Sequence, residues 1–180
     1  MNFRAPDSVR TLLENGADPN EKDAGGKTAL MWAARNGDAK IIGMLIEHGA
    51  EVNATEVRKR TALMWAATKD NTDAINILVK NGADIDMQND TGITALMYAI
   101  SHVKPSSVKL LLSLHANALI CNRHGQTAYD IAKTNNGFGL MSAIIAILPD
   151  PKAADSALES GHAAISRLRR GLERDREKVK

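Results

Sequence analysis

The sequence predicts an all-α solenoid in which short helices stack in pairs along one direction. The first observation is the tripeptide Thr-Ala-Leu, which recurs every 33 residues at Thr28, Thr61 and Thr94, with Thr-Ala-Tyr following at Thr127. A second marker keeps the same interval and begins at Gly16, Gly49 and Gly82, with a degraded copy at His115. Only 3% of the residues are aromatic, so the core must consist of Ala, Leu, Ile and Met, which favours closely packed helices over a β-sandwich.

The first half of each repeat predicts a short helix. Threonine is a preferred N-cap residue, and each in-phase threonine stands just before an apolar stretch. In the first complete repeat this stretch contains Leu30, Ala33 and Ala34, whose small side chains allow neighbouring helices to approach closely. Gly37 follows and is expected to end the helix.

The second half of each repeat predicts another helix and a turn. Ile41, Ile42 and Leu45 form a one-sided apolar stripe, and Gly49 supplies the left-handed residue that ends the helix. The segment 83–94 is rich in Asp, Asn and Gly, which predicts a β-hairpin-like projection, here called a finger. Neither helix can bury its stripe alone, so the repeats must stack.

The repeat phases divide the chain into an array at residues 1–148 and a tail at residues 149–180. The array consists of a half repeat at 4–22, complete repeats at 23–55, 56–88 and 89–121, and a shortened repeat at 122–148. The half repeat matches only the second helix of a unit. Two explanations stay open: further sequence precedes it, or a lone helix caps the array.

These motifs resemble the ankyrin-repeat family, in which a 33-residue unit carries a Thr-Pro-Leu-His signature. In this chain the signature reads Thr28-Ala29-Leu30-Met31, and the resemblance covers roughly residues 4–148. It implies stacked helix-turn-helix units with projecting fingers, and the repeat phases count about four and a half of them before the tail. It also implies that partners bind to the finger tips and to the exposed side of the first helices, which together line a concave surface.

Three residues depart from the pattern where glycine is expected. Lys59 and Val103 replace in-phase glycines, and a side chain in a left-handed conformation costs about 1–2 kcal/mol. We therefore expect a reshaped finger at Lys59 and a non-standard loop from His102 to Pro105. His115 is expected to end a helix in place of glycine.

The tail predicts an amphipathic helix. Leu158, Gly161, Ile165, Leu168 and Leu172 recur at steps of three or four residues, which places them on one helix face. Such a helix would cover the end of the solenoid. The alternatives are a partner-binding or self-associating helix, a disordered linker, or a helix on a membrane surface.

Composition excludes several classes of function. The formal net charge of +2 is too small to imply nucleic-acid or membrane binding by itself. Residues 167–180 alone contribute +4, so the rest of the chain carries about −2. A single cysteine, Cys121, forms no internal disulfide and fits an intracellular protein. No membrane span, catalytic constellation, metal-ligand spacing or phosphate-binding loop is visible, so the sequence predicts a non-enzymatic protein without a metal or cofactor.

The candidate partner-binding residues follow from the resemblance. They are Trp32, Arg35, Arg58, Arg60, Trp65, Lys69, Tyr98, His102 and Arg123. Trp32, Trp65 and Tyr98 share one phase, so they either fill space between first helices or form the floor of a recognition groove, where such residues are typical anchors. Lys27 and Lys59 add to the basic residues of this surface, against Asp70 and Asp90. A monomeric array that binds an acidic protein or peptide is therefore expected.

Other functions stay open. The array could be a regulatory or anchoring segment of a larger protein, or a bacterial effector secreted without a classical signal. Nucleic-acid binding is disfavoured because the predicted groove lacks the dense basic surface that phosphate neutralisation demands.

Overall fold

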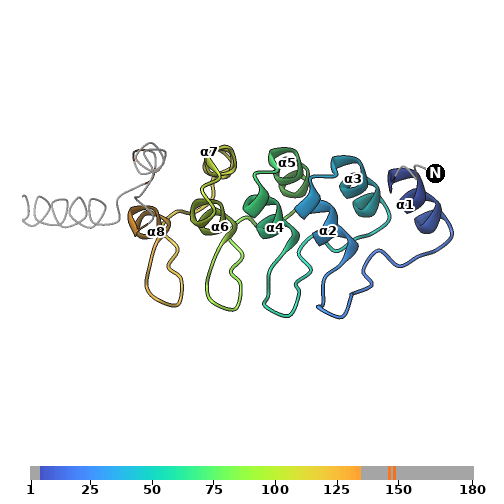
Figure 1. Cartoon of the computed structure of the whole chain (residues 1–180), viewed down its shortest axis with the longest axis horizontal. Coiled ribbons are helices and arrows are strands. Elements are labelled where there is room, and N and C mark those ends of the chain that lie inside the picture. The colour runs from blue at the N-terminus through green and yellow to red at the C-terminus, as the bar shows by residue number, and fades with distance from the viewer. Residues whose placement is uncertain (1–4, 135–145, 147, 149–180) are drawn as a thin grey trace, which may run out of the picture.

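The repeats form a row of helix pairs. The computed structural model describes residues 5–134, 146 and 148. In chain order the helices are α1 (Ala5–Glu14), α2 (Ala29–Asn36), α3 (Ala39–Glu47), α4 (Ala62–Lys69), α5 (Thr72–Lys80), α6 (Ala95–Ser101), α7 (Pro105–Ser113) and α8 (Ala128–Thr134). In Figure 1, α2, α4, α6 and α8 form one row, α1, α3, α5 and α7 form a second, and the fingers project from the first row. The all-α solenoid predicted from the repeats is confirmed.

One continuous core runs between the two rows. Leu30, Ile42, Leu63 and Ile75 are almost completely buried, and they come from alternating rows. Alanine fills the close contacts between first helices, as at Ala66 with no exposed surface. The small residues predicted to permit close helix approach therefore do so, and each repeat supplies the apolar partner that its neighbour lacks.

Helix starts and ends follow the repeat chemistry with one exception. Thr61 and Thr94 each accept a hydrogen bond at 3.3 Å from the backbone N–H three residues later, which confirms them as N-caps. Thr28 is also at the N-cap position, but its side chain makes no capping hydrogen bond. Gly37 and Gly49 are left-handed, with φ of 81° and 89°, as their placement predicts.

The residues that replace glycine keep the glycine conformation. Lys59, Val103 and His115 have φ of 55°, 53° and 67°. The backbone N–H of Lys59 donates to the Glu56 carbonyl at 2.8 Å, the same bond that Gly26 makes in the preceding finger. The expected reshaping of this finger is therefore wrong, although the left-handed lysine is real. The replacement of His115 for glycine is confirmed.

The loop at Val103 is also standard, contrary to the sequence prediction. The backbone N–H of Lys104 donates to the carbonyl of Ala99 at 2.8 Å, and Asp38 makes the equivalent bond to Ala33 at 3.0 Å. Packing on both sides holds the loop, so Val103 adopts a positive φ instead of changing its course.

Side chains in constant phase bridge successive repeats. Asn20 donates from Nδ2 to the Gly49 carbonyl at 3.0 Å and accepts from the Glu51 N–H at 2.7 Å. Asn53 makes the same two bonds to the next repeat. At the third junction Asp86 accepts the N–H of Asn117 at 2.8 Å. The backbone turns of adjacent repeats are thus tied together by side-chain hydrogen bonds.

The tail lies outside the described residues, as does most of the segment where the sequence predicts the second helix of the shortened repeat. Whether residues 149–180 cap the array or bind a partner stays a prediction. Within the described part of the chain, no helix is long and apolar enough to cross a membrane.

Replacing Lys59 with glycine is expected to raise the free energy of unfolding by about 1 kcal/mol, because glycine adopts φ of 55° without steric cost. Urea unfolding measures the effect. Lys59→Ala is the control, since alanine keeps the strain and removes only the exposed charge. Equal stability of the two variants would show that backbone strain at this position contributes nothing.

Candidate partner-binding surface

Each finger is held by a polar side chain at its base. Asp23 Oδ1 accepts the backbone N–H groups of Gly25 and Lys27 at 2.8 and 2.9 Å. Asn89 and Asn122 hold the third and fourth fingers in the same way. The sequence analysis missed this role, although the Asp or Asn at these in-phase positions carries the signal of an Asx turn.

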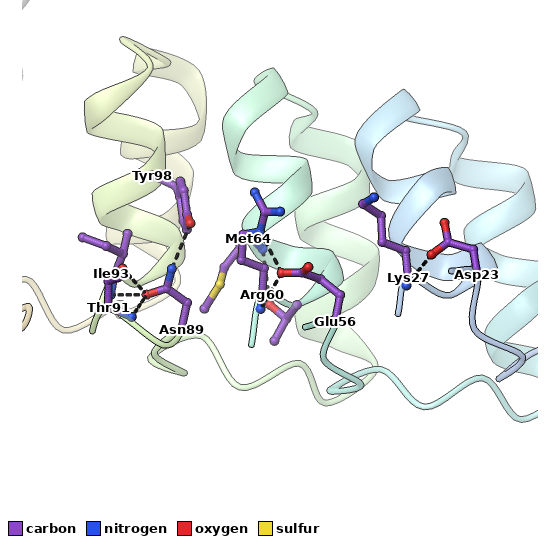
Figure 2. Close-up of polar contacts among 10 residues, drawn as sticks. Asp23, Lys27, Glu56, Arg60, Met64, Asn89, Thr91, Ile93 and Tyr98 are labelled. Carbon is purple, nitrogen blue, oxygen red and sulfur yellow. Dashed lines mark hydrogen bonds and ion pairs between the residues drawn. The ribbon is translucent and has the colours of Figure 1, made fainter. Parts of the chain in front are cut away.

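The second finger keeps the same backbone path but has Glu56 where the other repeats have Asp or Asn. Its longer side chain places Oε1 at 2.8 Å from Arg60 Nε and at 3.3 Å from the Arg60 backbone N. Only 2% of the Glu56 side chain is exposed. Burial raises the pKa of Glu56, but the hydrogen bonds from Arg60 and from the Arg58 backbone, together with the charge of Arg60, outweigh burial, and the net pKa is lowered. Figure 2 shows this pair between the bases of the first and third fingers.

Two of the three in-phase rings, those of Trp32 and Tyr98, form hydrogen bonds with the finger bases. Trp32 Nε1 donates to Asp23 Oδ2 at 3.0 Å, and Asn89 Nδ2 donates to the Tyr98 hydroxyl at 3.0 Å (Figure 2). In the second repeat Glu56 is engaged by Arg60, and the buried Trp65 Nε1 has no hydrogen-bond partner. The line of rings predicted from the repeat phase is therefore joined to the fingers at its first and third positions.

Three cations lie over the two tryptophan rings. The Arg60 guanidinium carbon is 4.1 Å from the Trp65 ring centroid. Arg35 lies 5.3 Å from the Trp32 centroid and 5.5 Å from that of Trp65, and Lys27 Nζ lies at 4.8 and 5.9 Å from the same two centroids. All these distances are within cation–π range. We call these five residues the cation–tryptophan cluster.

The structure brings some predicted site residues together and separates others. Trp32, Arg35, Arg60 and Trp65 belong to the cluster, and Lys27 completes it. Tyr98 and His102 form a separate pair, with ring centroids 6.1 Å apart. The remaining three predicted residues are exposed on fingers or at a helix end and lie outside the cluster: Arg58, Lys69 and Arg123.

The sequence analysis places Asp70 on the predicted partner-binding surface, but its side chain is engaged within the array. Its Oδ1 accepts the backbone N–H of Ser107 at 2.7 Å, at the start of α7 in the next repeat. Burial raises the pKa of Asp70, but the hydrogen bond from Ser107 and the charge of Lys104 outweigh burial, and the net pKa is lowered. Asp70 thus supplies, from the preceding repeat, the capping acceptor that the N-cap residue Lys104 does not provide.

The described residues contain no group of three or more His, Cys, Asp or Glu side chains that could hold a metal ion. Cys121 is exposed and free. The polar groups of this surface are used to fix fingers and to place cations on rings. This arrangement presents cations and aromatic rings together on one face of the array.

Comparison with known families matches most of the array. A family model for ankyrin repeats in three copies matches residues 1–89, and a model for a single ankyrin repeat matches residues 91–123. A search of curated proteins finds no match. The matched segments carry the repeat phases and the helix pairs described above. The chain therefore belongs to the ankyrin-repeat family.

Proposed function

We propose that this chain is a non-catalytic module that binds a protein or peptide partner through its inner face. The inner face is the side of α2, α4 and α6 that carries Trp32, Trp65 and Tyr98, together with the finger tips. Ankyrin repeats are generally protein–protein interaction modules and are typically non-catalytic. The observation that carries the proposal is the cation–tryptophan cluster on this face.

The residue types of the inner face favour binding. Trp32 is 38% exposed, so a partner that covers it would gain the burial of a large apolar ring. Trp, Tyr and Arg are the residues that dominate the binding energy of protein interfaces. The exposed cations Arg58 and Lys69 would speed the association of an acidic partner.

Truncating Trp32 tests the proposal. The full chain is used as bait in affinity purification, the captured protein is identified by mass spectrometry, and its affinity for purified variants is measured. Trp32→Ala is expected to weaken binding by about 2 kcal/mol, or about 30-fold. Leu12→Ala is the matched control, because Leu12 is 61% exposed on α1, away from the inner face.

Charge reversal on the same face provides a second test. Arg58→Glu with Lys69→Glu is expected to slow association of an acidic partner, whereas Lys40→Glu with Lys80→Glu on α3 and α5 makes the same charge change on exposed residues of the other row. Affinities are compared only between variants whose melting temperature matches that of the parent protein. Unchanged affinity in both Trp32→Ala and the Arg58 and Lys69 variant would place the binding surface elsewhere.

A further inference from the structure

Two cations of the cation–tryptophan cluster, Lys27 and Arg35, form no ion pair within the described residues, although the charge of Asp23 acts on Lys27. Within the described residues, Arg60 makes the one ion pair, with Glu56 at 2.8 Å. Lys27 and Arg35 both lie over the two tryptophan rings, and neither has a carboxylate within 4 Å among these residues. Two like charges are therefore held beside the same rings, where both would attract an external anion.

The neighbouring Arg60 shows how a carboxylate fits this surface. The Arg60 guanidinium lies over the Trp65 ring at 4.1 Å while its Nε donates to Glu56 Oε1. One cation thus contacts an indole face and a carboxylate at the same time. Arg35 has the same contact with the tryptophan faces and lacks the carboxylate.

We propose that Lys27 and Arg35 form a clamp for a carboxylate side chain of an acidic peptide partner. The clamp lies where the first two complete repeats meet, and Trp32, which is 38% exposed, packs against the body of the same peptide. This inference rests on the proposed function. It assigns the preference of the inner face for acidic peptides to one pair of cations. Arg60 is excluded from the clamp, because its charge is engaged by Glu56.

The charges near the clamp favour a carboxylate over a phosphate. Asp23 accepts the Trp32 indole N–H, and the hydrogen bonds from the Lys27 backbone and from Trp32 lower its pKa, so it is ionised beside the clamp. A phosphate with nearly two negative charges meets more repulsion here than a carboxylate with one. The two cations of the clamp alone provide fewer phosphate contacts than a nucleic acid needs.

The two tryptophans provide separate reporters for a test. The chain contains two tryptophans, so a ¹⁵N-labelled sample gives two indole N–H signals, which Trp32→Phe assigns. The probe is an acetylated and amidated peptide in which six glutamates alternate with serine, titrated into the full chain at low salt. The control peptide has glutamine in place of glutamate. Saturable shifts of both signals are expected with the glutamate peptide, and the glutamine peptide should bind at least about tenfold more weakly.

Matched variants identify the clamp. Lys27→Gln and Arg35→Gln are each expected to weaken binding of the glutamate peptide about fivefold. Lys40→Gln removes one exposed positive charge from α3 and should leave the affinity unchanged. If all three substitutions weaken binding equally, the affinity depends only on net charge and the clamp proposal is wrong.

Three results would overturn the proposal. Equal binding of the glutamate and glutamine peptides to the parent protein excludes carboxylate recognition. This comparison requires no protein variant. Tighter binding of a single-stranded oligonucleotide or of a phosphoserine peptide of equal charge assigns the cluster to phosphate. If the peptides fail while Trp32→Ala still loses the natural partner, the carboxylate clamp is wrong and the inner-face proposal stands.

Discussion

Replacing Arg60 with methionine is expected to lower the free energy of unfolding by about 3 kcal/mol. The substitution leaves the Glu56 carboxylate, of which 2% is exposed, without its ion-pair partner, and breaking a buried pair from one side is strongly destabilising. Urea unfolding at neutral pH measures the loss. A loss below about 1 kcal/mol would mean that water or another group solvates Glu56 in the folded state.

A double substitution separates the charge from the packing. Glu56→Gln combined with Arg60→Met removes the buried charge. The glutamine oxygen can still accept the backbone N–H of residue 60. This variant should recover most of the lost stability, because replacing both partners of a buried pair is often nearly neutral. Recovery of less than half would indicate that the stack of Arg60 on Trp65 carries the stability.

The effect of Arg60 also depends on pH. The pKa of Glu56 is lowered in the fold from its ordinary 4.5, so this pair contributes stability above about that pH. The contribution is lost as pH falls through the lowered pKa, where the carboxyl becomes protonated. The difference between the parent and Arg60→Met should therefore be largest at neutral pH and narrow below about pH 4.5.

Replacing Asp70 with alanine is expected to lower the free energy of unfolding by about 2 kcal/mol. Asp70 caps α7 through Ser107 at 2.7 Å, and loss of an N-cap costs about 1 kcal/mol. Its φ of 63° adds a further penalty, since alanine tolerates the left-handed region less well than aspartate.

Asp70→Gly is the matched variant. It also loses the cap, but glycine adopts positive φ freely, so it should be about 1 kcal/mol more stable than Asp70→Ala by thermal unfolding. Asp70→Asn keeps an acceptor oxygen and should be the mildest of the three. If alanine and glycine are equally stable, the left-handed backbone at residue 70 has no energetic weight.

The fold could be predicted from the sequence because its signals repeat. Threonine N-caps, small alanines and glycine ends recur every 33 residues, and each copy confirms the phase of the others. The failed predictions concern how backbone strain is resolved. Lys59 and Val103 were expected to change the local path, but packing on both sides of a solenoid unit fixes that path and leaves the residue strained.

The candidate site was only partly predictable. Phase placed Trp32, Trp65 and Arg35 on one face, but it did not show that Arg60 is engaged by Glu56. A single methylene group distinguishes Glu56 from Asp23, and the longer side chain lets the carboxylate bind the Arg60 side chain as well as the finger backbone. Which cations are free for a partner is therefore a three-dimensional property.

The side-chain bridges between repeats have a consequence for how the array opens. Asn20 and Asn53 each give two hydrogen bonds to the following repeat, whereas a carboxylate at Asp86 has no N–H to donate and gives one. A solenoid opens one interface at a time, because each unit contacts only its neighbours. The interface after Asp86 lacks one of these bonds but is also bridged from Asp70 to Ser107 and from Gln88 to the Cys121 carbonyl. Its opening free energy therefore depends on all three bridges, and amide hydrogen exchange in α7 should become faster when Asp70 or Gln88 is replaced by alanine.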